Sequence, residues 1–273
     1  MITNSIVLIS CNTNKENNKI TVSTSIIPEA TFIKAVCGDK INVITAIPEG
    51  YSPEIFEPTA PEMANINKSI VFFSIGVPSE INFLKSLSNT VEIINLADTV
   101  SEKYNDLELN GGRDPHIWLS IKRAKIMVDK ICQVMSEKDA KNAEFYALNA
   151  ENYKIQLDET DKYIKNKTEN MTNKKFIVFH PAFAYFADDY GLDMYAIEGD
   201  GNTATIKDLS TMIDFAKANN ITVVFNQAEV DSSWISSFTQ EIENGSFILL
   251  SPLSADYIEN LKCMADAISS SNQ

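Results

Sequence analysis

The chain of 273 residues contains only two histidines, and both stand beside the start of a helical stretch. His116 lies in Asp-Pro-His-Ile-Trp, just before a long helical stretch, and His180 follows an apolar stretch that ends at Phe179. A neutral imidazole is the commonest protein ligand for metal ions, although a single histidine more often has a structural role. Two histidines at equivalent positions of two similar halves favour a shared metal site.

Hydrophobic periodicity predicts the elements that position these histidines. Apolar strands alternate with helical stretches from residue 19 to residue 96, and the same alternation returns from residue 176 to residue 269. Strands that alternate with helices are typical of parallel sheets covered by helices. We therefore expect an α/β protein with two lobes, each containing a mainly parallel sheet flanked by helices.

A long helical stretch connects the two halves. It begins near residue 120, pauses at residues 136–139 and continues to about residue 165. About 25 residues of helix span about 38 Å, which is enough to pass from one lobe to the other. We predict a rigid linking helix at 137–168, between an N-terminal lobe at 19–136 and a C-terminal lobe at 169–273. A lipoprotein signal remnant and tether at 1–18 precede them.

This arrangement predicts where a ligand binds. Ligands of open α/β sheets lie beyond the carboxyl ends of the strands, and in two-lobed proteins they lie between the lobes. His116 and His180 both occupy positions at the edge of such a cleft. Trp118 is expected to pack at the interface between the lobes.

The composition excludes some classes of function. With 44% hydrophobic residues the chain can form two cores and is too apolar to be disordered. The net charge of −14 and the pI of about 4.6 leave no basic face for nucleic acid. Because the acidic side chains are scattered along the chain, they indicate a soluble surface more than a cation-attracting one.

The four cysteines do not form a recognisable zinc motif, because no Cys-x-x-Cys spacing occurs. Cys37, Cys132 and Cys263 stand among apolar residues and are expected to be small buried side chains. Cys11 follows a short apolar run and a small residue, which resembles the lipobox of a bacterial lipoprotein. The alternative is a buried strand. No stretch approaches the ~20 apolar residues of a membrane span, so a lipid on Cys11 is the only expected membrane anchor.

Several motifs together resemble the metal-binding solute-binding proteins of ABC importers for zinc, manganese and iron, the periplasmic zinc-uptake type. The strongest is Asp-Pro-His-Ile-Trp at residues 114–118. The others are Gly-Tyr-Ser-Pro-Glu-Ile-Phe-Glu-Pro-Thr at 50–59, Phe-His-Pro-Ala-Phe-Ala-Tyr-Phe at 179–186 and Pro-Leu-Ser-Ala-Asp-Tyr at 252–257. They occur in the order of the family and cover roughly residues 19–270.

The resemblance implies a set of metal ligands. His116 and His180 match ligand positions, and Glu54 stands where the family usually has its first histidine. A carboxylate can bind zinc or manganese, and it shifts selectivity toward manganese or iron. The fourth ligand is open: Ser251 stands where some members have an aspartate, and Gln227 where the family often has a glutamate. Glu229, Asp231 and water are alternatives.

Two carboxylates are candidates for contacts that orient the ligands. Asp114 lies two residues before His116, and its alternative role is to stabilise the start of a helix. Glu57 lies three residues after Glu54, and its alternative role is that of a solvated turn residue.

These observations predict a binding protein without catalytic activity. It captures Zn²⁺ or Mn²⁺ between its lobes as transported ligand and delivers it to an ABC importer permease. We expect a monomer that is extracytoplasmic and lipid-anchored to the cell membrane. Two alternatives remain open, a surface adhesion or scaffold lipoprotein that has lost the metal and a zinc hydrolase with an activated water.

Overall fold

The computed structural model describes residues 19–109, 111–198, 205–227 and 233–271. The first lobe contains a four-stranded parallel sheet in the order β2-β1-β3-β4. Its strands are β1 (Ile20–Thr24), β2 (Ile41–Thr45), β3 (Val71–Ser74) and β4 (Glu92–Asn95). β3 is buried along its whole length, as expected for a parallel strand covered on both faces.

The second lobe repeats this topology. Its parallel sheet has the order β10-β9-β7-β8, so both lobes place their first strand between the second and the third. The strands are β7 (Lys175–Val178), β8 (Asp193–Ala196), β9 (Val223–Gln227) and β10 (Ser246–Leu250). The strand order reverses between β1 and β3 in one lobe and between β7 and β9 in the other. Such switch points are where open α/β sheets bind ligands.

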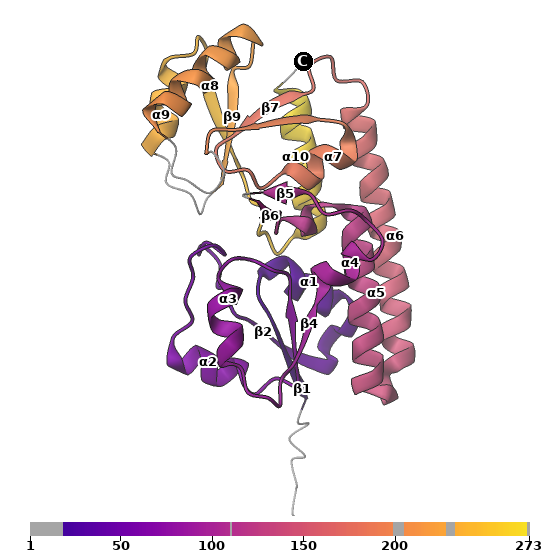
Figure 1. The fold of residues 1–273 in the computed structure, drawn as a ribbon. Helices are drawn as coiled ribbons and strands as arrows, with labels where there is room; N and C mark the ends of the chain where they lie inside the picture. The colour runs from indigo at the N-terminus through magenta and orange to yellow at the C-terminus, as the bar shows by residue number, and fades with distance from the viewer. Residues whose placement is uncertain (1–18, 110, 199–204, 228–232, 272–273) are drawn as a thin grey trace, which may run out of the picture.

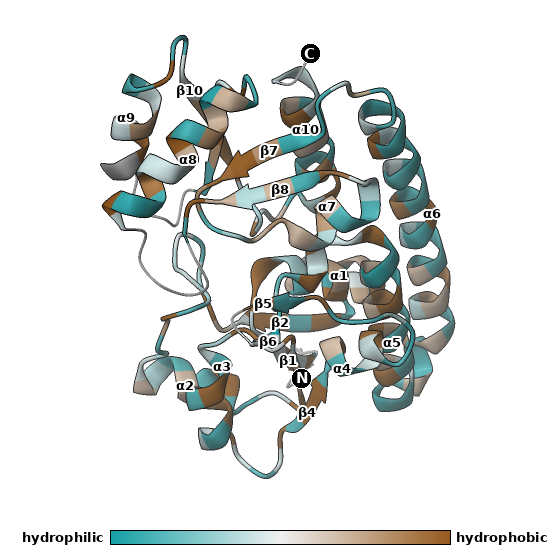
Figure 2. Ribbon diagram, turned by 45° about the horizontal axis from the view of Figure 1, so that its top comes forward, coloured by the Kyte–Doolittle hydropathy of each residue, from teal (hydrophilic) through white to brown (hydrophobic). Residues whose placement is uncertain are grey.

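Helices cover both sheets, and the brown of β7 in Figure 2 marks the hydrophobic residues of one covered strand. In the first lobe they are α1 (Ile27–Cys37), α2 (Ala60–Ile66), α3 (Glu80–Phe83) and α4 (Leu96–Ser101). In the second they are α7 (Ala184–Tyr190), α8 (Ile206–Ala218), α9 (Ser233–Gln240) and α10 (Tyr257–Ser270). The expected α/β class with two parallel sheets is therefore confirmed. The sequence patterns missed α4 and a small antiparallel hairpin, β5 (Glu108–Leu109) and β6 (Gly112–Arg113).

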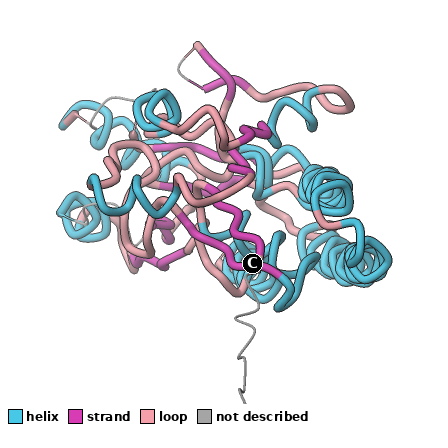
Figure 3. Tube along the Cα trace, turned by 90° about the horizontal axis from the view of Figure 1, so that it is seen from below, coloured by secondary structure: helices cyan, strands magenta, loops and turns pink. Residues whose placement is uncertain are grey.

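Two long helices connect the lobes. α5 (Ile121–Lys138) and α6 (Ala143–Thr168) lie side by side along one flank of the molecule in Figure 1, and Figure 3 shows them nearly end-on. α6 has 26 residues, so the expected long linking helix is present. It begins at Ala143 and not near residue 137, because Asp139 interrupts the helix. The Asp139 carboxylate accepts hydrogen bonds from Asn142 and Tyr146, which fixes the turn between the helices.

The lobes share one hydrophobic core. A single cluster of buried side chains runs from Val22 of β1, through α5 and α6, to Ile268 of α10. Trp118 adds polar contacts between the lobes: its Nε1 donates to the Pro252 carbonyl at 2.7 Å, and its own carbonyl accepts from the Tyr257 hydroxyl. Within the described ranges, no helix combines the length and the apolarity that crossing a membrane requires.

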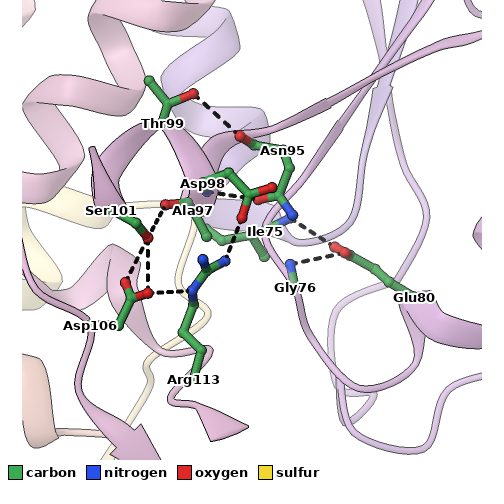
Figure 4. A network of polar contacts seen from close by, with 10 residues as sticks. All are labelled: Ile75, Gly76, Glu80, Asn95, Ala97, Asp98, Thr99, Ser101, Asp106 and Arg113. Atoms are coloured by element: carbon green, nitrogen blue, oxygen red, sulfur yellow. Dashed lines mark hydrogen bonds and ion pairs between the residues drawn. The ribbon is translucent and has the colours of Figure 1, made fainter. Parts of the chain in front are cut away.

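Two buried carboxyl groups, Glu29 of α1 and Glu80 of α3, form an acid pair in the first lobe. Glu80 accepts hydrogen bonds from the backbone N–H groups of Ile75 and Gly76, which follow β3 (Figure 4). Ser25 donates its hydroxyl to the same carboxylate. Burial raises the pKa of both carboxyls, and the charge of Glu80 raises the pKa of Glu29 further.

The acid pair predicts how stability depends on pH. The folded state raises the pKa values of both carboxyls. The contribution of the protonated pair to the free energy of unfolding is therefore full at acidic pH and is lost as pH rises through the raised pKa values. Glu29→Gln is expected to increase the free energy of unfolding at pH 8, since the amide stays neutral in this buried position without having to bind a proton. A gain of about 1–3 kcal/mol is expected, falling toward zero at pH 4.5. Urea unfolding at both pH values measures it.

The exposed Glu102→Gln serves as a matched control, because it makes the same chemical change outside the core. Equal losses of stability for Glu29→Gln at both pH values would contradict this prediction, because they would show that the Glu29 side chain supports the fold through its hydrogen bonds whatever its protonation state.

Candidate metal-binding site

A cavity of about 220 Å³ lies between the lobes, at the carboxyl ends of both sheets. Its wall in the first lobe includes Val77 and Pro78, which follow β3. In the second lobe it includes His180 after β7 and Gln227 at the end of β9. Both switch points therefore face the same space. The remaining lining residues are Ser52, Pro53, Glu54, Ile55, Pro115, His116, Trp118, Glu198, Pro252 and Leu253.

The structure brings together Glu54, His116 and His180, the three residues expected to bind a metal through charged or imidazole side chains. One ligand atom of each lies within 4.8 Å of the others. The two imidazole rings meet edge to face, with centroids 5.3 Å apart. Within the described ranges, this is the one group of at least three His, Cys, Asp or Glu side chains with such spacing.

His116 is fixed by Asp114. The Asp114 Oδ1 lies 2.8 Å from His116 Nδ1 and 2.9 Å from its backbone nitrogen. Nδ1 therefore donates to the carboxylate, and Nε2 is left as the metal-binding atom. Arg113 anchors the preceding hairpin by ion pairs with Asp98 and Asp106 (Figure 4). The short Asp-Pro-His turn is thus held from both sides before the chain enters α5.

His180 lies between two carboxylates from different lobes. Its Nδ1 is 2.8 Å from Glu198 Oε2, and its Nε2 is 3.1 Å from Glu54 Oε1. Burial lowers the pKa of His180, but the hydrogen bonds and charges of Glu198 and Glu54 outweigh burial and raise it to about 9. At neutral pH the imidazole is therefore protonated and paired with both carboxylates.

Glu54 comes from the loop between β2 and α2. A hydrogen bond fixes this loop: the backbone N–H of Ser79 donates to the Pro53 carbonyl at 3.2 Å. The hydrogen bond from His180 lowers the pKa of Glu54, although burial opposes this effect. The Glu54 side chain is 43% exposed, whereas that of His116 is 8% exposed. An ion can therefore reach the site from the Glu54 side.

The other predicted residues lie in different places. Gln227 lines the cavity, is buried and has no hydrogen-bond partner at Nε2. Ser251 is not among the described residues that line the cavity, and its carbonyl accepts from Asn260 at 2.6 Å. Glu57 is exposed and lines a separate hollow beside α2 and α3. Glu229, Asp231 and Cys11 lie outside the described residues.

The sequence analysis missed Glu198. This carboxylate follows β8, the strand next to β7, so it emerges at the same sheet edge as His180. The signal that could have identified it is an acidic residue directly after a strand adjacent to the one before His180. Its contact with Nδ1 is of the kind that fixes the tautomer and orientation of a metal-binding histidine.

Loss of Glu198 is expected to weaken metal binding. Glu198→Ala removes the acceptor at Nδ1 and should lower the affinity for zinc by about 10–100-fold. The affinity should be measured above pH 9, where a proton no longer competes with zinc for His180. Competition with a metallochromic chelator reports the affinity. Glu198→Gln keeps an acceptor oxygen and should lose less, and equal affinities of wild type and Glu198→Ala would contradict this role.

The donor set fits a divalent transition metal. Two imidazole nitrogens and one carboxylate oxygen are ligands that zinc, manganese and iron accept, at about 2.0–2.2 Å for zinc. Both imidazoles have carboxylate partners on their other nitrogen. Such partners accompany almost every metal-binding histidine.

Comparison with known proteins points in the same direction. Residues 22–271 match the family model ZnuA, zinc-uptake complex component A periplasmic. The manganese ABC transporter substrate-binding lipoprotein PsaA of Streptococcus mitis is 29% identical over 259 residues, with 86% of this chain and 82% of PsaA covered. The high-affinity zinc uptake system protein ZnuA of Bacillus subtilis (strain 168) is 27% identical over 287 residues, with 94% and 89% covered. A zinc-bound ZnuA deletion mutant has a similar structure, with a TM-score of 0.87 at 29% identity over 94% of this chain and 99% of that one.

Proposed function

We propose that this chain, which belongs to the ZnuA family of periplasmic zinc-uptake components, captures zinc or manganese between its lobes and delivers it to an ABC permease. The single observation that carries the proposal is the group formed by Glu54, His116 and His180. Glu54 comes from one lobe, His180 from the other and His116 from the segment that joins them. One ion bound there would contact both lobes at once.

The ligand types bias the choice of metal. An oxygen ligand at Glu54 makes the site harder than one with three histidines, which favours manganese or iron relative to that alternative. The two imidazoles remain good ligands for zinc. The two relatives named above are a manganese transporter component and a zinc uptake protein. We therefore propose both zinc and manganese as cargo, and the measured affinities for the two ions will show which is preferred.

The proposed role is transport and not catalysis. A carrier must bind its ion tightly and later release it. The exposed Glu54 is the ligand that a permease or a proton can reach first, and the buried His116 and His180 hold the ion until then. We propose that the protein works as a monomer, because the three ligands come from one chain.

We also propose an extracytoplasmic position with a lipid on Cys11. The apolar run and small residue that precede Cys11 support this proposal, and the related PsaA is named a lipoprotein. Residues 12–18 would then be the tether between the lipid and β1, which begins at Ile20. Radiolabelled palmitate incorporation that Cys11→Ala abolishes would support the anchor. Unchanged incorporation would contradict it.

Calorimetric titration of chelator-stripped protein with zinc, and then with manganese, tests the capture step. One ion per chain with submicromolar affinity, about −8 kcal/mol or better, is the expected result for at least one metal. Absence of binding for both metals would contradict the proposed function. Metal accumulation by cells that lack the protein, with and without the wild-type gene, then tests delivery.

A further inference from the structure

The three proposed ligands do not complete the coordination of any candidate metal. Zinc takes four ligands, and manganese and iron take more. Among the described residues, no further His, Cys, Asp or Glu side chain joins the group of Glu54, His116 and His180. Glu198 lines the same cavity, but its carboxylate contacts His180 Nδ1. Within the described residues, an ion bound to these three side chains therefore keeps positions for a further ligand.

The cavity is much larger than an ion needs. Its volume of about 220 Å³ equals several water molecules at about 30 Å³ each. Its lining includes the apolar side chains of Val77, Trp118 and Leu253. A purely hydrated ion would leave water against these surfaces. A small molecule with an apolar part would cover them.

Gln227 supplies a polar group that has no partner among the described residues. It is the last residue of β9, is 6% exposed and lines the cavity. Its Nε2 makes no hydrogen bond. Buried amide groups in folded proteins almost always have partners, so an unpaired donor beside a cavity indicates an acceptor atom on a ligand. The acceptor best suited to both an amide donor and a cation is an anionic oxygen.

We propose that the site takes its metal together with a small anionic oxygen chelator of the carboxylate or hydroxamate type. Two oxygens of the chelator fill open positions on the ion, and one of them accepts a hydrogen bond from Gln227. Its apolar part lies against Val77, Trp118 and Leu253. This inference rests on the proposed function, because the chelator binds only where the ion is held by Glu54 and the two histidines.

Cobalt-loaded protein offers a direct test, because the visible absorption of Co²⁺ changes when a ligand enters its coordination sphere. Acetohydroxamate, a bidentate oxygen chelator with one negative charge, is the probe. The wild-type spectrum is expected to change on titration with a single dissociation constant. Gln227→Met keeps the length of the side chain and removes the donor, and it should raise that constant about tenfold, the effect of one hydrogen bond.

Two further variants complete the design. Gln133→Met makes the same chemical change on the exposed face of α5 and should match the wild type. Gln227→Glu places a negative charge beside the chelator and should weaken acetohydroxamate more than Gln227→Met does. It also provides a second measurement if Gln227→Met proves unstable in thermal unfolding.

The outcomes separate this inference from the proposed function. Cobalt binding without any response to acetohydroxamate, or with the same response in wild type and both Gln227 variants, would overturn the inference and leave metal capture intact. Absence of cobalt, zinc and manganese binding in the wild type would overturn both. A response that depends on Gln227 would establish that the ion is bound by the protein and by the chelator together.

Discussion

Replacement of both His116 and His180 by alanine is expected to lower the affinity for zinc by at least about 1,000-fold. Loss of a group that only orients a ligand costs about 10–100-fold, so loss of two direct ligands costs more. The remaining carboxylate of Glu54 is half-exposed and cannot hold an ion against water alone. Competition with a chelator of known affinity measures the effect, and circular dichroism confirms that the variant is folded.

A matched pair of charge changes tests the third ligand. Glu54→Gln removes a carboxylate from the group, whereas Glu57→Gln makes the same change three residues later, where the side chain lines a separate hollow. Only the first should weaken zinc binding, and the effect on manganese should be larger because manganese depends more on oxygen ligands. Equal effects of both variants would reduce the role of Glu54 to general electrostatic attraction.

Metal affinity is expected to fall steeply with decreasing pH. The pKa of His180 is raised to about 9 by Glu198 and Glu54, which outweigh the effect of burial. An ion must therefore displace one proton from Nε2 throughout the neutral range. Below pH 9 each pH unit should lower the apparent affinity about tenfold, so that it drops about 100-fold between pH 8 and pH 6.

Calorimetry measures the displaced proton directly. At pH 7 the binding of one zinc ion should release about one proton from His180, which appears as a dependence of the heat on the ionisation enthalpy of the buffer. Glu198→Ala provides the control, because loss of that carboxylate lowers the pKa of His180 and moves the pH profile toward acid. An affinity that is constant from pH 6 to pH 8 would show that His180 is neutral before the ion binds.

This proton gives the ion pair between Glu54 and His180 a functional meaning. Glu54 belongs to the first lobe and His180 to the second, and their contact of 3.1 Å crosses the cleft. The proton on His180 occupies the direction in which a metal would bind. Proton and metal therefore compete for the same nitrogen, and an acidic environment favours release of the cargo.

Much of the fold could be predicted from the sequence because its elements are strongly periodic. The alternation of apolar strands with helices indicated two parallel sheets, and the long amphipathic stretch indicated α6. A pause was expected at residues 136–139, whereas α5 continues to Lys138 and the break lies at residues 139–142. Hydrogen bonds to the Asp139 carboxylate fix this break, and periodicity does not report them. The hairpin β5–β6 was missed because each of its strands has only two residues.

The site was predictable to the extent that its residues lie in motifs. His116, His180 and Glu54 occur in three separate motifs, and topology brings one ligand atom of each within 4.8 Å of the others. Glu198 has no motif of its own, and its position depends on β8 pairing beside β7. The absence of a partner for Gln227 Nε2 is a property of packing, which the sequence does not encode in any local pattern.

The central claim is that one divalent metal ion is held between the lobes by Glu54, His116 and His180. Anomalous diffraction at the zinc absorption edge, from crystals of zinc-loaded protein, tests it most directly. One strong peak is expected about 2.0–2.2 Å from Nε2 of each histidine and from a Glu54 oxygen. A peak bound to other residues, or no peak in the cleft at full zinc loading, would contradict it.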